Sequence, residues 1–244
     1  MDIPLVTSIW RGLAGMSDSL PLAWAMAKPL FASGLPERGL ARLIERAQLP
    51  APEPLMPMQL AAVGVDGLEL ARIRTVVEAY NRSNGMNLVA LAALVSTHTA
   101  SQGEAPVPSA PTTWQDFPQL LAQEEIAKNT WDLIREVNAF GTSGVDAHVA
   151  TLWRHLAHWP GLLALIHAAF APMRSSGEIA DATQRVTDLA QEEGARLVHL
   201  RTHTQSLPAD ALGTITGYVT TPTQVVRMVT LGHILARWLP STDS

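Results

Sequence analysis

Three histidines and a threonine fall at helical spacing between positions 148 and 158. His148, Thr151, His155 and His158 stand at i, i+3, i+7 and i+10, so one helix would carry all four on one face. Imidazole titrates near neutral pH, so His148 or His155 beside the Thr151 hydroxyl could act as a general base. The spacing predicts His148 and Thr151 as candidate catalytic residues.

A metal site is the competing interpretation of these histidines. His155 and His158 are three residues apart and His199 and His203 are four apart, spacings at which two imidazoles can share one ion. No nearby carboxylate pair completes either set, and a helix rises too far from His148 to His158 for three rings to meet one ion. The chain also has no cysteine, which removes thiolate ligands and thiol chemistry. We therefore expect neither a metal nor a cofactor.

The segments that would position these groups are helical. Between residues 68 and 83, apolar residues recur every three or four positions, which is typical of an amphipathic helix, and Asp66 is placed to cap its start. Pro36, Pro160 and Pro208 each precede a helical pattern, as proline favours the first turn. Runs of β-branched residues are few and short. The fold class predicted by this pattern is all-α.

The chain contains an internal repeat. The motif Trp-Arg-x-Leu-Ala begins at Trp10 and again at Trp153, while Tyr80 and Tyr218 each end a helical pattern before a polar turn and a further apolar helix. Both pairs have nearly the same separation. This predicts two helical repeats, residues 1–101 and 119–244, joined by a Pro-rich linker at 102–118. Two such repeats would form an intramolecular pseudo-dimer with a cleft between them. The alternative is coincidence, since Leu and Ala matches are frequent in helical proteins.

Composition excludes several classes of partner. Charged residues make up 16% of the chain, the net charge is −5 and no basic stripe is present, so we expect no nucleic acid. The apolar runs are too short for a bilayer, and the first residues, MDIPLVTSIWRG, lack the pattern of a signal peptide. We expect a cytoplasmic protein without a membrane partner. The motifs leave the oligomeric state open and permit a homodimer.

Four stretches of the sequence resemble the group I 2-haloacid dehalogenases of the DehI type. These stretches are LPLAW (20–24), the long segment from Ala61 to Leu91, LAHWPGLL (156–163) and GHILARWL (232–239), and they cover both halves of the chain. The resemblance implies an all-α pseudo-dimer with its active site between the repeats. It also implies hydrolytic dehalogenation of a small carboxylic acid, in which a carboxylate activates the water that attacks the halogen-bearing carbon directly.

The resemblance also implies which residues would bind the substrate. The Asn that the family places in a turn of the first repeat corresponds to Asn84, and a Tyr three residues further on corresponds to Asn87. Near the N-terminus the family has aromatic residues that line the pocket, and these positions correspond to Leu5 and Ser8. This part of the pocket wall is therefore not aromatic in this chain. His233 matches a family histidine, and we expect it either to line the cleft or to be an ordinary core residue.

The position of the family's catalytic base does not carry a base in this chain. Where the family has Ser-Asp, this sequence has Thr151-Leu152, and leucine cannot accept a proton. Asp146 is a substitute candidate together with His148, although an Asp at this place is also the expected N-cap of the following helix. Two functions remain: a hydrolase acting on a small 2-substituted carboxylic acid, weakened by loss of the family base, or a catalytically inactive relative that binds a small acid or has a structural role.

Overall fold

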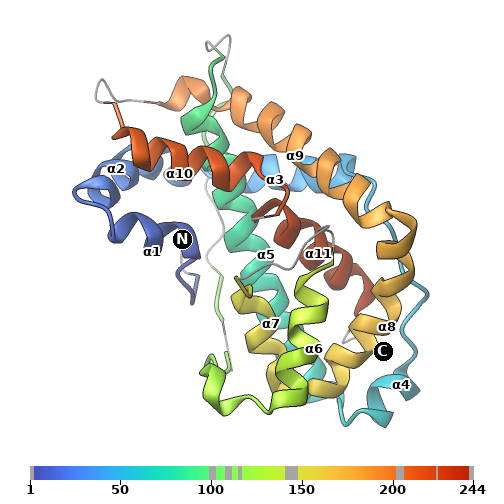
Figure 1. The fold of residues 1–244 in the computed structure, drawn as a ribbon. Helices are drawn as coiled ribbons and strands as arrows, with labels where there is room; N and C mark the ends of the chain where they lie inside the picture. The colour runs from blue at the N-terminus through green and yellow to red at the C-terminus, as the bar shows by residue number, and fades with distance from the viewer. Residues whose placement is uncertain are drawn as a thin grey trace. The chain divides into compact units, whose positions relative to one another are not determined.

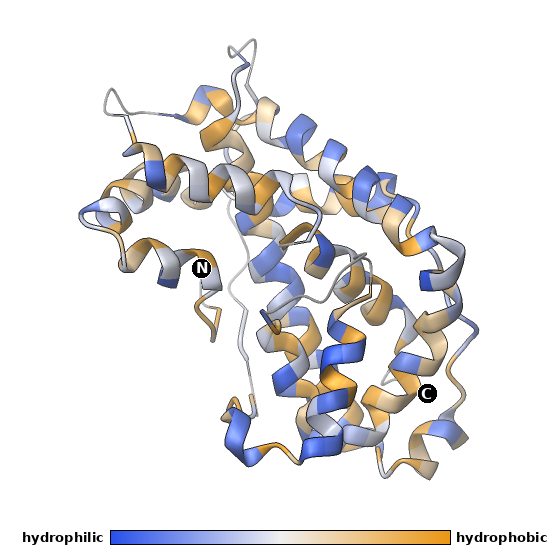
Figure 2. Cartoon of the chain, viewed as in Figure 1, coloured by the Kyte–Doolittle hydropathy of each residue, from blue (hydrophilic) through white to orange (hydrophobic). Residues whose placement is uncertain are grey.

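The computed structural model describes residues 3–98, 103–107, 112–114, 117–140, 148–201, 206–223 and 225–241. Over these residues the chain forms eleven α-helices and three short 3₁₀-helices, and no strand (Figure 1). This confirms the all-α fold class. Many helices carry both hydrophobic and hydrophilic residues, as amphipathic helices around an apolar core do (Figure 2). None of the described helices is long and apolar enough to cross a membrane.

The helices form two compact units built from interleaved segments. Unit 1 combines Met1–Gln48, Arg82–Thr113 and Thr183–Val229, and unit 2 combines Leu49–Asn81, Trp114–Ala182 and Thr230–Ser244. Each unit therefore takes segments from both predicted repeats. Whether residues 1–101 and 119–244 superpose as repeats, with 102–118 as their linker, stays a prediction.

Unit 1 is built on the C-terminal part of the longest helix. Its elements are α1 (Ser8–Ala14), α2 (Ser19–Ala32), α3 (Leu35–Arg46), residues 82–95 of α5 (Gly67–Val95), most of α9 (Glu178–Arg196), the 3₁₀-helix η3 (Val198–Leu200), α10 (Ala209–Thr220) and the first turn of α11 (Val225–Trp238). Within it, Arg42 of α3 donates to the buried Glu193 of α9 from Nε at 3.0 Å and from Nη2 at 2.6 Å. The bonds to Glu193 raise the pKa of Arg42. This ion pair joins two helices that are distant in sequence.

Unit 2 holds the remaining helices. Its elements are α4 (Pro57–Ala62), residues 67–81 of α5, η1 (Gln123–Glu125), α6 (Lys128–Asn138), α7 (Thr151–His155), η2 (Leu156–His158), α8 (Pro160–Ser176), the first turn of α9 and residues 230–238 of α11. Pro160 opens α8, as predicted, and the large side chains of Phe140, Trp153 and Phe170 are fully buried. The Asp66 carboxylate accepts from the Glu69 amide at 2.9 Å, which confirms the predicted cap of α5.

The polar turn predicted after Tyr80 is absent. Asn84, Gly85 and Asn87 lie in the interior of α5, which continues for 29 residues. Tertiary partners explain the difference. In unit 2, Asn81 donates to the carbonyl of Gly232 at 2.9 Å; in unit 1, a Cβ on Gly85 would come within 2.4 Å of Leu40, so glycine allows α3 to approach. Packing and side-chain bonds thus keep helical a segment whose residue types favour a turn.

The single helix predicted to run from His148 to His158 is also absent. Helix α7 has only five residues, from Thr151 to His155, and His148 precedes it. Ala150 is extended, with ψ of 136°, because the amide of Asn138 holds this segment: its Oδ1 accepts from Ala150 N at 3.1 Å and its Nδ2 donates to His148 O at 3.0 Å. At the other end Trp159 leaves the helical region because the ring of Pro160 disfavours it there.

Candidate functional site

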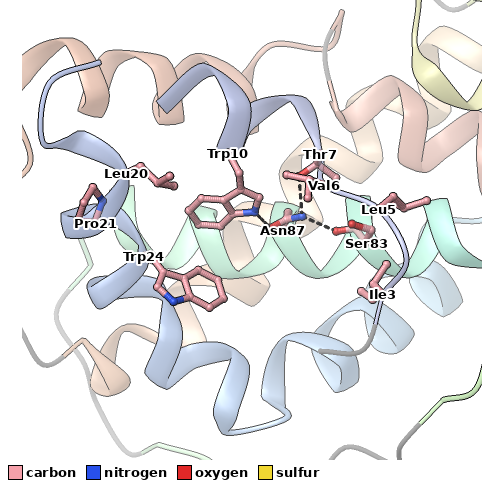
Figure 3. A pocket seen from close by; sticks show the side chains of 10 residues that line it. All are labelled: Ile3, Leu5, Val6, Thr7, Trp10, Leu20, Pro21, Trp24, Ser83 and Asn87. Carbon is pink, nitrogen blue, oxygen red and sulfur yellow. Dashed lines mark hydrogen bonds between the residues drawn. The ribbon is translucent and has the colours of Figure 1, made fainter. Parts of the chain in front are cut away.

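Unit 1 contains a pocket of about 570 Å³ between its N-terminal segment, α1, α2 and α5 (Figure 3). Ligand pockets usually have volumes of roughly 300–1,000 Å³, so the pocket is large enough to be a binding site. The residues that line it are Ile3, Leu5, Val6, Thr7, Trp10, Leu20, Pro21, Trp24, Ser83 and Asn87. None of these ten residues is charged, and seven of them are apolar. An apolar wall with a few polar groups is the usual composition of a small-molecule site.

The polar groups of the pocket are gathered around Asn87. Its Oδ1 accepts from the Trp10 indole Nε1 at 2.9 Å, and its Nδ2 donates to the Thr7 hydroxyl at 3.2 Å and to the Ser83 carbonyl at 2.8 Å (Figure 3). These bonds use both amide protons of Asn87, so its side chain is fixed. Because the Thr7 oxygen is the acceptor in its bond, the Thr7 O–H proton can still be donated to a ligand.

An aromatic cluster forms another part of the wall. Trp24 lies edge-to-face with Trp10, with ring centroids 5.5 Å apart and planes at 87°, and it stacks on Phe31 at 5.9 Å and 26°. Trp24 is nevertheless 39% exposed, and the neighbouring lining residue Val6 is 62% exposed. Large apolar side chains that remain exposed beside a pocket are typical of ligand sites.

Tyr218 of α10 is a buried phenol next to this polar group. It is only 5% exposed, and burial raises the pKa of its hydroxyl, which the nearby Thr7 hydroxyl offsets in small part. The contact with Thr7 does not meet the geometry of a hydrogen bond, and the phenol oxygen has no other bonding partner among the described residues. The Tyr218 hydroxyl is therefore neutral throughout the physiological pH range, and it does not form a hydrogen bond with Thr7.

The predicted substrate-binding residues divide between the two units. Asn87 and Leu5 line the pocket, whereas Ser8 is not among the lining residues, and whether Asn87 binds a ligand stays a prediction. Asn84 lies half-buried in α5 of unit 1, outside that lining, and not in a turn. His233 belongs to unit 2. Whether Asn84 and His233 contact a ligand stays a prediction.

The predicted catalytic residues belong to unit 2 as far as they are described. His148 is exposed, Thr151 is the half-buried first residue of α7, and Asp146 lies outside the described residues. Leu152, at the position of the family base, is 1% exposed and packs in the core of this unit. The side chain at this position therefore serves packing, and the catalytic role of the three candidates stays a prediction.

His155 is a structural residue and not a free base. Its Nε2 lies 3.1 Å from the carbonyl oxygen of Pro118, which can only accept, so Nε2 carries the proton and Nδ1 accepts from the Tyr80 hydroxyl at 2.7 Å. Burial lowers the pKa of His155 to about 4, more than the bond to Pro118 raises it. Both ring nitrogens are used, so the suggestion that His155 could replace the missing carboxylate is wrong.

The pair at i and i+3 holds a chain segment and not a metal ion. His158 donates from Nε2 to the carbonyl of Gln119 at 2.8 Å, next to the bond between His155 and Pro118, and Arg154 donates to the carbonyl of Leu121. Three side chains of α7 and η2 thus attach residues 118–121 to this unit. Of these three carbonyls, only that of Pro118 falls in the predicted linker; those of Gln119 and Leu121 fall at the start of the predicted second repeat.

Two further histidines, His199 and His233, lie elsewhere in the described part of the chain. His199 has ring nitrogens 3.0 and 3.3 Å from the carbonyls of Arg196 and Glu104, and its predicted partner His203 lies outside the described residues. Burial lowers the pKa of His233 to about 4, with a smaller contribution from Arg237. Over the described part of the chain, no three His, Asp or Glu side chains are close enough to share a metal ion.

Sequence reasoning missed Thr7, Ser83 and Trp24 as pocket residues. Trp24 could have been predicted, because it ends the LPLAW stretch on which the resemblance partly rests. Ser83 could also have been predicted, because it lies one turn before Asn87 on α5. Thr7 could not be predicted from the sequence, because a single threonine in an extended segment belongs to no recognisable residue pattern. Its role depends on the bond from Asn87, which is eighty positions away in the sequence.

The described residues thus form an all-α protein with a largely apolar pocket beside its longest helix. The architecture is that of a solved structure described as "the complex structure of D-2-haloacid dehalogenase mutant with D-2-CPA", which aligns with a TM-score of 0.74, covering 98% of this chain and 87% of that one, at 14% sequence identity. The all-α fold that the resemblance implied is therefore confirmed, whereas the pseudo-dimer of two repeats stays a prediction. No protein-family model matches the chain, and no curated protein matches it by sequence.

Proposed function

We propose that this protein binds a small 2-substituted carboxylic acid in the pocket of unit 1 and hydrolyses such acids slowly or not at all. The observation that carries the proposal is the lining of the pocket. Leu5 and Asn87, two positions that the sequence resemblance assigned to ligand binding, line one pocket on a fold shared with a D-2-haloacid dehalogenase. That relative's description names D-2-CPA as its ligand.

The pocket has the two parts that such an acid needs. Ile3, Leu5 and Val6 offer apolar surface for the carbon skeleton of a small acid. The hydroxyls of Thr7 and Ser83, beside the fixed amide of Asn87, offer donors to the carboxylate. No cation lines the pocket, so the carboxylate depends on these neutral donors, and hydrogen bonds to a charged group are each worth about 1.5–3 kcal/mol.

Weak hydrolysis follows from the missing base. No carboxylate or imidazole is among the lining residues, and position 152 carries a buried leucine. A positioned general base contributes roughly 10²–10⁴ in rate, so without one only slow turnover is expected.

Calorimetric titration with D- and L-2-chloropropionate tests binding, and halide release tests turnover. Thr7→Val should weaken binding about ten- to a hundredfold, since one bond to the carboxylate is lost. Thr75→Val is the matched control, because the Thr75 hydroxyl bonds the Ala71 carbonyl on α5 outside the pocket lining. Equal binding by both variants would contradict the proposal for this pocket.

Fast halide release would contradict the second half of the proposal. A base would then be acting, and Asp146 and His148 are the candidates to replace, by Asn and by Gln. Leu152→Asp is a poor rescue experiment by itself, because it would place a carboxylate in the core of unit 2, where burial disfavours the ionised form. Its folding must be checked by circular dichroism before its activity is interpreted.

A further inference from the structure

The pocket is much larger than a two- or three-carbon haloacid. Each water in the liquid takes a volume of about 30 Å³. At that generous allowance per non-hydrogen atom, the six such atoms of 2-chloropropionate fill roughly 180 Å³, whereas the pocket offers about 570 Å³. A three-carbon acid would leave most of the apolar wall in contact with water. The volume favours a ligand of about ten to fifteen non-hydrogen atoms.

The unused part of the pocket is suited to a flat ring. Trp24, which lines the pocket, is held by stacking on Phe31 and by the edge-to-face contact with Trp10, yet it is 39% exposed. Aromatic rings bind one another through offset stacking or edge-to-face contacts. Because its neighbours already orient Trp24, a ligand ring would contact a surface that needs no reordering.

The polar lining residues lie together in the pocket, with apolar residues on both sides of them (Figure 3). Thr7, Ser83 and Asn87 lie together, while Leu20, Pro21 and Trp24 lie to one side of them (Figure 3). A ligand that satisfies both parts carries its acid group at one end and its ring at the other. An uncharged apolar wall also rejects a second charge on the ring end, since burying an unpaired charge is costly.

We infer that the ligand class of this pocket is monocarboxylic acids with one aromatic ring, such as aryloxy- or arylalkanoic acids, in place of two- or three-carbon haloacids. This rests on the proposed function, because it assumes that an acid is bound in the pocket. The ring contacts Trp24 and Leu20, and the carboxylate accepts from the hydroxyls of Thr7 and Ser83.

Three probes test the inference by calorimetric titration of the full chain: 2-chloropropionate, 2-phenoxypropionate and the neutral analogue 2-phenoxypropan-1-ol. We expect 2-phenoxypropionate to bind at least about tenfold more tightly than 2-chloropropionate, and the alcohol more weakly than the acid of the same shape. If 2-chloropropionate binds as tightly as 2-phenoxypropionate, the inference is wrong and the proposed function stands. If the alcohol binds as tightly as the acid, acid recognition is wrong and aromatic recognition stands. If neither acid binds, both are wrong.

A matched pair of variants locates the ring. Leu20→Trp fills the apolar part of the pocket, and Leu212→Trp adds the same side chain at an exposed leucine of α10 that does not line it. Leu20→Trp should weaken 2-phenoxypropionate binding by about tenfold or more while changing 2-chloropropionate binding by less than about threefold. Leu212→Trp should change neither. Equal loss for both acids in Leu20→Trp overturns the assignment of the ring.

Trp24→Leu provides a second variant if Leu20→Trp does not fold. Trp24 is partly exposed, so the shorter side chain is tolerated, but the aromatic surface is removed. Affinity for 2-phenoxypropionate should fall several-fold, with 2-chloropropionate unaffected. An unchanged affinity for 2-phenoxypropionate contradicts a role of Trp24 in binding the ring.

Discussion

The segments after Tyr80 and Tyr218 have a similar pattern of residues but different backbones. After Tyr80, α5 continues without interruption to Val95. After Tyr218, α10 ends at Thr220, Thr221 is extended, and α11 begins at Val225. The second segment contains Pro222, which lacks an amide proton and disfavours helical geometry in the residue before it. The first has no proline, and its turn-favouring residues are Asn, Ser and Gly. A proline ends a helix by sterics, whereas small polar residues end one only when no tertiary contact opposes it.

The hydroxyl groups of Tyr80 and Tyr218 also differ, because only one of them makes a hydrogen bond. The Tyr80 hydroxyl donates to Nδ1 of His155 within unit 2, while the Tyr218 hydroxyl of unit 1 is buried without a hydrogen bond among the described residues. Equivalent positions of the predicted repeat thus serve different purposes. Each of the following experiments alters one side of this comparison.

The largest effect is expected from a proline in the first segment. Asn84→Pro removes a hydrogen bond within α5 and brings the ring against the carbonyl of Tyr80, so the free energy of unfolding should fall by about 3 kcal/mol or more. Pro222→Ala is the control on the other segment, with an expected loss below about 1 kcal/mol. Urea denaturation measures both. A loss under about 1 kcal/mol for Asn84→Pro would show that the continuity of α5 contributes little to stability.

Substitution of two glycines should give the next largest change in the free energy of unfolding. A Cβ on Gly85 would lie 2.4 Å from Leu40, so Gly85→Ala should lower the free energy of unfolding by about 1–3 kcal/mol although alanine is the better helix former. Gly213 in α10 has no atom within 4 Å of such a Cβ, and Gly213→Ala should raise stability by about 0.5–1 kcal/mol. A gain in both variants would mean that packing does not hold Gly85.

Substitution of the two tyrosines should change the free energy of unfolding by a similar or smaller amount. Tyr80→Phe leaves Nδ1 of the buried His155 without a donor and should lower the free energy of unfolding by about 1–3 kcal/mol. Tyr218→Phe removes a hydroxyl that makes no hydrogen bond, so its effect should stay within about 0.5 kcal/mol or be stabilising. Thermal denaturation followed by circular dichroism compares the pair. Equal losses would indicate that Tyr218 has a partner in solution.

Protonation of His155 should leave the stability of the fold unchanged at neutral pH and should lower it only in acid. The pKa of His155 is lowered to about 4 in the fold, against an ordinary value of 6.5, so the unfolded chain binds the proton first. The stability is complete above pH 6.5 and declines as the pH falls towards 4. The thermal midpoint should decline over that window, and His155→Phe should flatten the decline.

His98→Phe is the control for this measurement, because His98 is exposed. It should leave the acid sensitivity unchanged. If His155→Phe keeps the full decline, His233, whose pKa burial also lowers to about 4, becomes the source.

The sequence by itself determined the helical class and many of the helix starts. Apolar periodicity and the placement of Asp66 and Pro160 act within a few residues, so they can be read from neighbours along the chain. The two pocket positions Leu5 and Asn87 were also available from the sequence, through the resemblance.

Only the tertiary structure decided the continuity of α5, the five-residue length of α7 and the role of His155. Each depends on a bond from a residue outside the local segment: Asn81 to Gly232 for α5, Asn138 to Ala150 for the start of α7, and Tyr80 for His155. The pocket is the same kind of feature, because Thr7 and Trp10 meet Asn87 across about eighty positions. Local preferences differ by less than about 1 kcal/mol per residue, whereas a buried polar group without its partner costs about 1–3 kcal/mol, so the distant partner determines the outcome.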